Sequence, residues 1–185
     1  MKNRMKAKRL ISVLLLLLAV GCTYFVAGCG TVKREDFKTN HAFDSNPDPY
    51  VRSRIWSKVR TVGRLPLFGY RTYSAPYTLH IDFWSHDRPE EGVLIHSMAL
   101  KEGANTVFKL GEEAPMRIEF EWNDTSRRYK ASYREMLPDS VEFADGKELN
   151  LSIEWAIPGI ADRQFSKTRF VGERSRKRAP LLTDI

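Results

Sequence analysis

The chain has 185 residues, of which 30 are basic and 23 acidic, for a formal net charge of +7. Residues 1–28 contain five of the basic residues and none of the acidic ones, so residues 29–185 carry 25 against 23, or +2. This near balance excludes a nucleic-acid-binding function argued from global charge. Residues 29–185 are numerous enough for one domain with its own core.

The N-terminal stretch has three parts. Residues 1–9 are basic, residues 10–20 are almost wholly apolar, and small residues precede each of the two cysteines, Cys22 and Cys29. A basic, an apolar and a small-residue part in this order are typical of a secretory signal peptide, whose apolar part enters the bilayer as a helix. An uncleaved anchor is the alternative, because residues 10–28 are nearly long enough to span a bilayer.

The four residues that end at Cys29 read VAGC, and those that end at Cys22 read AVGC. They resemble the lipobox of bacterial lipoprotein signal peptides, in which an aliphatic and two small residues precede the cysteine. VAGC fits this pattern more closely, because Ala19 opens AVGC where leucine or valine is usual. The resemblance implies cleavage before the cysteine and a diacylglycerol thioether on its sulfur.

We expect Cys29 to be the lipidated residue, with Cys22 as the alternative. Cleavage before Cys22 would leave three apolar residues, 24–26, exposed beside the membrane, and it would leave Cys29 as a free thiol in an oxidising compartment. Gly30 stands where lipoproteins retained in the inner membrane of Gram-negative bacteria usually carry an aspartate. The resemblance therefore implies an outer-membrane anchor facing the periplasm.

Composition divides the chain into four parts. Residues 1–28 form the lipoprotein signal peptide, residues 29–49 an acylated cysteine and flexible tether, residues 50–171 a β-sandwich domain, and residues 172–185 a basic C-terminal tail. The tether lacks an apolar period and ends near two prolines, and the tail also lacks an apolar pattern. The basic residues of the tail are Arg174, Arg176, Lys177 and Arg178.

Between tether and tail, apolar and polar residues alternate over short segments, among them 77–84, 116–122, 129–133 and 149–155. Period-two alternation indicates half-buried antiparallel strands. We therefore predict an all-β fold, an antiparallel β-sandwich of the immunoglobulin-like or transthyretin-like kind, with a small β-barrel as the alternative. In the first segment, one face has Tyr77, Leu79, Ile81 and Phe83, and the other has Thr78, His80, Asp82 and Trp84.

One hairpin register is also predicted. A three-residue loop over 144–146 would place Val141 opposite Leu149, on one face of the sheet. It would also put Gly146 at the left-handed position that such loops need.

Residues 51–62 are ambiguous, but a strand explains their charges better than a helix. In a strand all the basic residues fall on even positions and so share one face. An ordinary solvated or edge-strand face is the simpler interpretation, and contact with anionic lipid or glycan is the functional one. This candidate binding set is Arg52, Arg54, Trp56, Lys58 and Arg60.

The histidines offer a candidate metal site. His80 and Asp82 share a strand face, and His86 follows at the end of the strand; zinc needs three or four such ligands. The alternation favours a polar outer face over a metal site, so we expect no metal. His96, between Leu94 and Met98, is expected to be a hydrogen-bonded inner or rim histidine.

Three classes of function remain, since the sequence has no Gly-x-Ser-x-Gly motif and no glycine-rich phosphate loop. The favoured one is a lipid-anchored envelope lipoprotein that acts as a structural or protein-interaction module, an adaptor in an envelope or secretion assembly. An exposed Trp84 and an open strand edge could recruit its partner. The alternative is a binding module for anionic lipid, lipopolysaccharide or cell-wall glycan through the basic strand face or the tail.

A metal-dependent enzyme at His80 and Asp82 is the third class, and the lack of a catalytic motif argues against it. We therefore expect no catalytic residue, no cofactor and no nucleic-acid partner. The expected partners are the membrane, through the N-terminal lipid, and an envelope protein.

Overall fold

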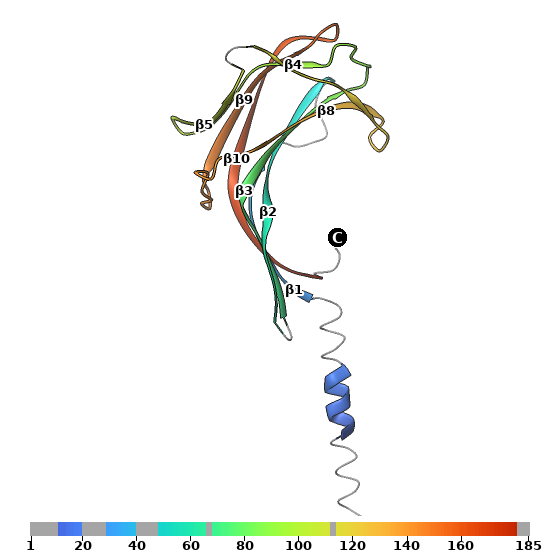
Figure 1. Cartoon of the computed structure of the whole chain (residues 1–185), viewed down its shortest axis with the longest axis vertical. Coiled ribbons are helices and arrows are strands. Elements are labelled where there is room, and N and C mark those ends of the chain that lie inside the picture. The colour runs from blue at the N-terminus through green and yellow to red at the C-terminus, as the bar shows by residue number, and fades with distance from the viewer. Residues whose placement is uncertain (1–10, 20–28, 40–47, 66–67, 112–113, 181–185) are drawn as a thin grey trace, which may run out of the picture. The chain divides into compact units, whose positions relative to one another are not determined.

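The computed structural model describes residues 11–19, 29–39, 48–65, 68–111 and 114–180 (Figure 1). Strands make up 69% of the structure and helix 7%, which confirms the predicted all-β class. Residues 11–19 form a helix whose apolar side chains are exposed. Within the described residues, no helix has the length and apolar character needed to cross a membrane.

Within the described residues, ten strands form one sheet, and most neighbouring strands are antiparallel. In order of hydrogen bonding they run β5-β4-β9-β10-β1-β2-β3-β8-β7, with β6 paired to β4 off this path. Among the described strands, β5 and β7 lie at the two ends of this order, so the sheet is open. The strands are β1 (Cys29–Thr39), β2 (Tyr50–Leu65), β3 (Phe68–Ser85), β4 (Val93–Glu102), β5 (Asn105–Leu110), β6 (Met116–Ile118), β7 (Glu121–Asn123), β8 (Arg128–Met136), β9 (Glu148–Ile157) and β10 (Ala161–Pro180).

The chain separates into two compact units. Unit 1 comprises Met1–Arg34, Val59–Tyr73 and Ser175–Ile185, and unit 2 comprises Glu35–Lys58 and Ser74–Arg174. In unit 1, β1 runs parallel to β3, with paired residues from Gly30 opposite Gly69 to Arg34 opposite Tyr73. The Arg34 guanidinium lies 4.4 Å from the centre of the Tyr73 ring.

Unit 2 contains the hydrophobic core, to which β1, β2, β3, β4, β8, β9 and β10 all contribute. The sheet curves so that strands distant in its order cover the same core: the rings of Phe83 on β3 and Trp155 on β9 lie 5.5 Å apart. This arrangement is sandwich-like, as predicted. The face predicted to point inward from β3 is the buried one; Tyr77, Leu79, Ile81 and Phe83 are each at most 1% exposed.

The flexible tether predicted over residues 29–49 needs correction, because residues 29–39 form β1. This strand lies between β10 and β2 inside the sheet. Phe37 is buried opposite Ile55, and its ring meets that of Tyr77 at 5.1 Å. Sequence reasoning missed the strand because a single large apolar residue, Phe37, anchors its unit 2 part. Residues 40–47 lie outside the described part of the chain.

The tail predicted over residues 172–185 needs the same correction, because β10 continues to Pro180. Gly172 exchanges two backbone hydrogen bonds with the loop before β9: its amide donates to Lys147 and its carbonyl accepts from Gly146. Arg174 forms an ion pair with Glu35 at 3.2 Å. The sequence did not predict this strand, because its basic residues show no alternating apolar pattern and its pairing depends on backbone groups.

Two smaller predictions also need correction. The segment 116–122 is divided into β6, which pairs with β4, and β7, which pairs with β8, so it is not one strand. The hairpin between Val141 and Leu149 does not form, because both edges of β9 are taken by β4 and β10. Gly146 does adopt the predicted left-handed conformation, with φ of 76°, in a turn that the Lys147 amide closes onto the Ala144 carbonyl.

Candidate functional site

Strand β2 presents a basic and aromatic face in unit 2, as the alternation predicted. Ser53 and Ile55 are buried, whereas Trp56 and Lys58, at even positions beyond them, are exposed. The strand interpretation of residues 51–62 is therefore confirmed. Arg52 and Arg54 are half-buried.

Strands β3 and β8 extend this face. Their antiparallel register pairs His80 with Arg134, Asp82 with Ser132 and Trp84 with Lys130. Cross-strand partners share a side of the sheet. The side chains of β3 opposite its core residues are thus flanked by β8 on one side and by β2 on the other.

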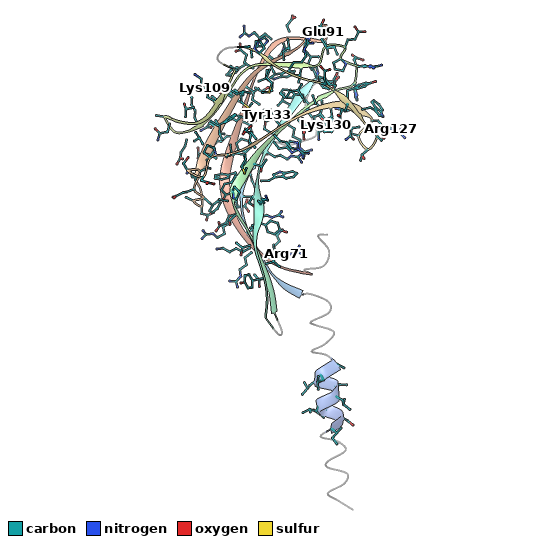
Figure 2. All side chains as sticks on the ribbon, in the orientation of Figure 1. Arg71, Glu91, Lys109, Arg127, Lys130 and Tyr133 are labelled. Carbon is teal, nitrogen blue, oxygen red and sulfur yellow. The ribbon has the colours of Figure 1, made fainter. Side chains whose placement is uncertain are left out.

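A buried aspartate lies at the centre of the face. The carboxylate of Asp82 is 1% exposed, and one of its oxygens accepts a hydrogen bond from Arg54 Nη2 at 2.8 Å. The other oxygen accepts from Ser132 Oγ at 2.8 Å and lies 3.0 Å from Lys130 Nζ. Three strands therefore meet at one carboxylate. Figure 2 shows Lys130 on β8.

These contacts decide the ionisation of Asp82. Burial by itself raises the pKa of Asp82, but hydrogen bonds from Ser132 and Lys130 and the nearby positive charge together lower it by more. The pKa of Asp82 consequently lies below its ordinary value of 3.8, and the group is a carboxylate at neutral pH.

His80 is buried beside this carboxylate, with 4% of its surface exposed. Burial is the main cause that lowers its pKa below the ordinary 6.5; the neighbouring Asp82 raises it, and Arg54 and Arg134 lower it again. Nε2 of His80 lies 2.9 Å from Asp82 Oδ1, and its Nδ1 is 3.5 Å from Arg54 Nη2. The imidazole is therefore kept neutral at neutral pH inside a ring of cations.

The sequence interpretation of His80 and Asp82 as a polar outer face is wrong about solvation. They do lie on the side opposite the core, but long side chains from β2 and β8 cover them. As a metal site the pair lacks a third ligand: His86 is exposed beyond the end of β3. Among the described residues, no group of three histidine, cysteine or acidic side chains is placed to hold a metal ion.

Aromatic rings surround the polar centre. The ring centres of Trp56 and His80 lie 5.5 Å apart. The Arg54 guanidinium lies over the Trp56 ring, 4.6 Å from its centre. Trp84 is half-buried, stacks with Tyr50 at 6.3 Å and lies 5.2 Å from Lys130 Nζ. A cation over the face of an aromatic ring is attracted by the quadrupole of the ring. Trp84 is thus less exposed than the sequence predicted.

We call the whole surface the cation–aromatic face. Its strands β2, β3 and β8 contribute six cations and one carboxylate within unit 2. The sequence predicted only the β2 part, because nothing local relates β8 to β2. The face consists of Tyr50, Arg52, Arg54, Trp56, Lys58, His80, Asp82, Trp84, Arg128, Lys130, Ser132 and Arg134.

The remaining predicted residues lie elsewhere. Arg60 belongs to the unit 1 part of β2, and its side chain is outside the description. His96 is half-buried where the register of β4 and β9 shifts between Ile95 and Ser97. The backbone of Cys29 begins β1, whereas its side chain and the whole of Cys22 are outside the described part.

A second surface feature was not predicted. A groove of about 680 Å³ lies over β4, β9 and β10 in unit 2. Phe165, which is 61% exposed, lines it beside Lys167, whose ammonium lies 5.3 Å from the ring centre. Arg169 and Lys101 also line it, and Arg169 is paired with Glu148. Its only sequence signal was an apolar residue at an outward position of β10.

Comparison of the chain with protein-family models, curated proteins and solved structures found no match.

Proposed function

We propose that the chain is a lipid-anchored envelope lipoprotein whose unit 2 is a protein-interaction module, and that the cation–aromatic face binds an acidic surface of its partner. The N-terminal signal and the VAGC sequence before Cys29 support the anchor. The observation that carries the binding proposal is the Asp82 carboxylate, which holds Arg54 and Lys130 in fixed positions on one sheet face.

Preorganisation is the physical reason. A flexible surface arginine or lysine loses side-chain entropy when it binds a partner, at a cost of about 0.5–1.5 kcal/mol each. Arg54 and Lys130 have already lost this freedom to Asp82, while 28% and 21% of their side chains remain exposed. Strands β2, β3 and β8 contribute six cations and one carboxylate to the face, and Glu121 of β7, which lies opposite Lys130, adds a second carboxylate, so positive charge still predominates there.

The aromatic residues fit the same role. Trp56 is 50% exposed on this face, and tryptophan and arginine are among the residues that most often dominate binding energy at protein interfaces. Anionic lipid, lipopolysaccharide or cell-wall glycan is the alternative ligand of the same face. A metal-dependent reaction at His80 has less support, because Asp82 and two arginines already surround the imidazole.

Photo-crosslinking in the native envelope tests this proposal. A photoreactive amino acid replaces Trp56, and in a matched control it replaces Phe165, an exposed aromatic residue of unit 2 outside the face. We expect a defined protein adduct from position 56 and not from position 165. Lys58→Glu should weaken the adduct at position 56, whereas Lys167→Glu should leave it unchanged.

Mass spectrometry of the same preparations identifies the adducts and the N-terminus. Lipid or glycan adducts alone at position 56 would favour the alternative ligand over a protein partner. A protein adduct that is insensitive to Lys58→Glu would contradict the role of the basic face. A mature N-terminus at Cys29 with added acyl mass is expected, and an unmodified N-terminus would contradict the anchor.

A further inference from the structure

The two units carry opposite charge. From Cys29 onward, the segments of unit 1 contain eight basic residues and a single acidic one, for a net +7. Of the 25 basic and 23 acidic residues from Cys29 on, this leaves 17 and 22 in unit 2, or −5. The net +2 of residues 29–185 thus conceals a strongly basic unit 1. Its basic residues are Lys33, Arg34, Arg60, Arg64, Arg71, Arg176, Lys177 and Arg178.

The first strand of unit 1 also begins at the expected lipid attachment residue. Strand β1 starts at Cys29 and is already paired at the next residue, where Gly30 lies opposite Gly69. A strand rises about 3.3 Å per residue, so Tyr70, opposite Thr31, lies about 7 Å along the strand from Cys29. Arg71, opposite Val32, lies about 10 Å along it (Figure 2).

This pairing leaves no flexible spacer between a lipid on Cys29 and the basic strands. The sheet order places β10, with the exposed Arg176 and Lys177, next to β1. The Debye length at physiological ionic strength is about 8 Å, so charges held within one or two such lengths of a membrane still interact with it. A tether of the kind predicted from the sequence would have removed this effect.

We propose that unit 1 docks on the membrane surface to which the lipid is anchored, with exposed cations such as Arg176 and Lys177 against the phosphates of anionic phospholipids. The proposal rests on lipidation at Cys29, as proposed above. Charge complementarity identifies the occupant: the strand segments of unit 1 contain no acidic residue that would repel phosphate. Exposed Tyr70 and Val62 provide apolar surface at the same unit, as interfacial side chains do.

The test uses the full mature lipoprotein, whose acyl mass is first verified by mass spectrometry. With Cys29 acylated and residues 1–28 removed, Tyr70→Cys introduces the only free thiol, to which a fluorophore is attached. The protein is reconstituted in vesicles of phosphatidylcholine alone, or of phosphatidylcholine and phosphatidylglycerol in equal parts. Both contain a spin-labelled lipid that quenches fluorescence near the headgroups. A label at Thr125→Cys, an exposed position of unit 2, is the control.

We expect stronger quenching at position 70 in the anionic vesicles than in the neutral ones, and no such difference at position 125. Raising the salt to about 1 M shortens the Debye length to about 3 Å and should abolish the difference. Replacing Arg176 and Lys177 by glutamine should lower the docked-to-undocked ratio about thirtyfold, since each cation near an anionic surface contributes about 1 kcal/mol. Glutamine at Arg88 and Lys101, two exposed cations of unit 2, should leave it unchanged.

The outcomes separate this proposal from the lipid anchor itself. Acylated protein whose label at position 70 responds equally to neutral and anionic vesicles would overturn the docking and leave the anchor standing. An equal loss of docking with the unit 2 variant would also overturn it, because the effect would then reflect overall charge. Protein without acyl mass would overturn both.

Discussion

Replacing Asp82 with asparagine removes the charge on which three strands converge, while the side-chain size is retained. Asp82 accepts hydrogen bonds from Arg54 and Ser132, each at 2.8 Å, and lies 3.0 Å from Lys130 Nζ. Breaking a buried ion pair by removing one partner costs about 3–5 kcal/mol. Arg54 and Lys130 remain partly exposed and can turn towards water, which reduces this cost. We therefore expect Asp82→Asn to lower the free energy of unfolding by about 3 kcal/mol.

Urea unfolding followed by tryptophan fluorescence measures this loss, and Tm should fall by about 6–12 °C. Asp87→Asn makes the same chemical change at an exposed position and should change the free energy of unfolding by less than about 0.5 kcal/mol. Adding Lys130→Met to Asp82→Asn should cost less than the sum of the single changes, because one uncompensated cation is removed. A loss below about 1 kcal/mol for Asp82→Asn would refute the reasoning, since solvated carboxylates behave in that way.

Two further predictions concern the pH dependence of stability and the backbone strain at Gly111. Because the pKa of His80 is lower in the folded chain than its ordinary 6.5, its contribution to stability is complete above pH 6.5 and decreases as the pH falls from there to the folded pKa. His80→Gln should flatten this decrease in pH-dependent unfolding, and an unchanged pH profile would contradict it. Gly111 has φ of 85°, and a Cβ there would lie 2.5 Å from a backbone carbonyl oxygen, whereas Gly103 has φ of 57° and open space. Gly111→Ala should therefore lower Tm clearly more than Gly103→Ala, and equal shifts would show that the close contact relaxes at no cost.

Local patterns predicted the inner core well because burial of alternate residues needs only a period of two. The inward residues of β3 were identified from their spacing alone, and the basic face of β2 was found in the same way. The same reasoning failed for β1 and β10. Their positions are held by backbone pairing inside the sheet, and backbone hydrogen bonds leave no trace in side-chain polarity.

The candidate site shows the same limit. His80 and Asp82 were found by their shared strand face, but their burial depends on Arg54 of β2 and Lys130 of β8. Lys130 lies 48 residues beyond Asp82 in the chain, and its partner was settled by the register of β8 on β3. Sequence reasoning therefore named a possible ligand set where the structure has an ion-pair network.

By itself the sequence determined the all-β class, the inward face of β3 and the basic face of β2, because these depend on neighbours two residues apart. The lipobox-like sequence VAGC is also a local motif, and lipidation at Cys29 remains a prediction. Only the tertiary structure decided that the strand begins at Cys29, that unit 1 gathers the positive charge, and that Asp82 is buried among cations. Each of these depends on strands far apart in the chain becoming neighbours, and long-range pairing is set by the total packing of the sheet rather than by local spacing.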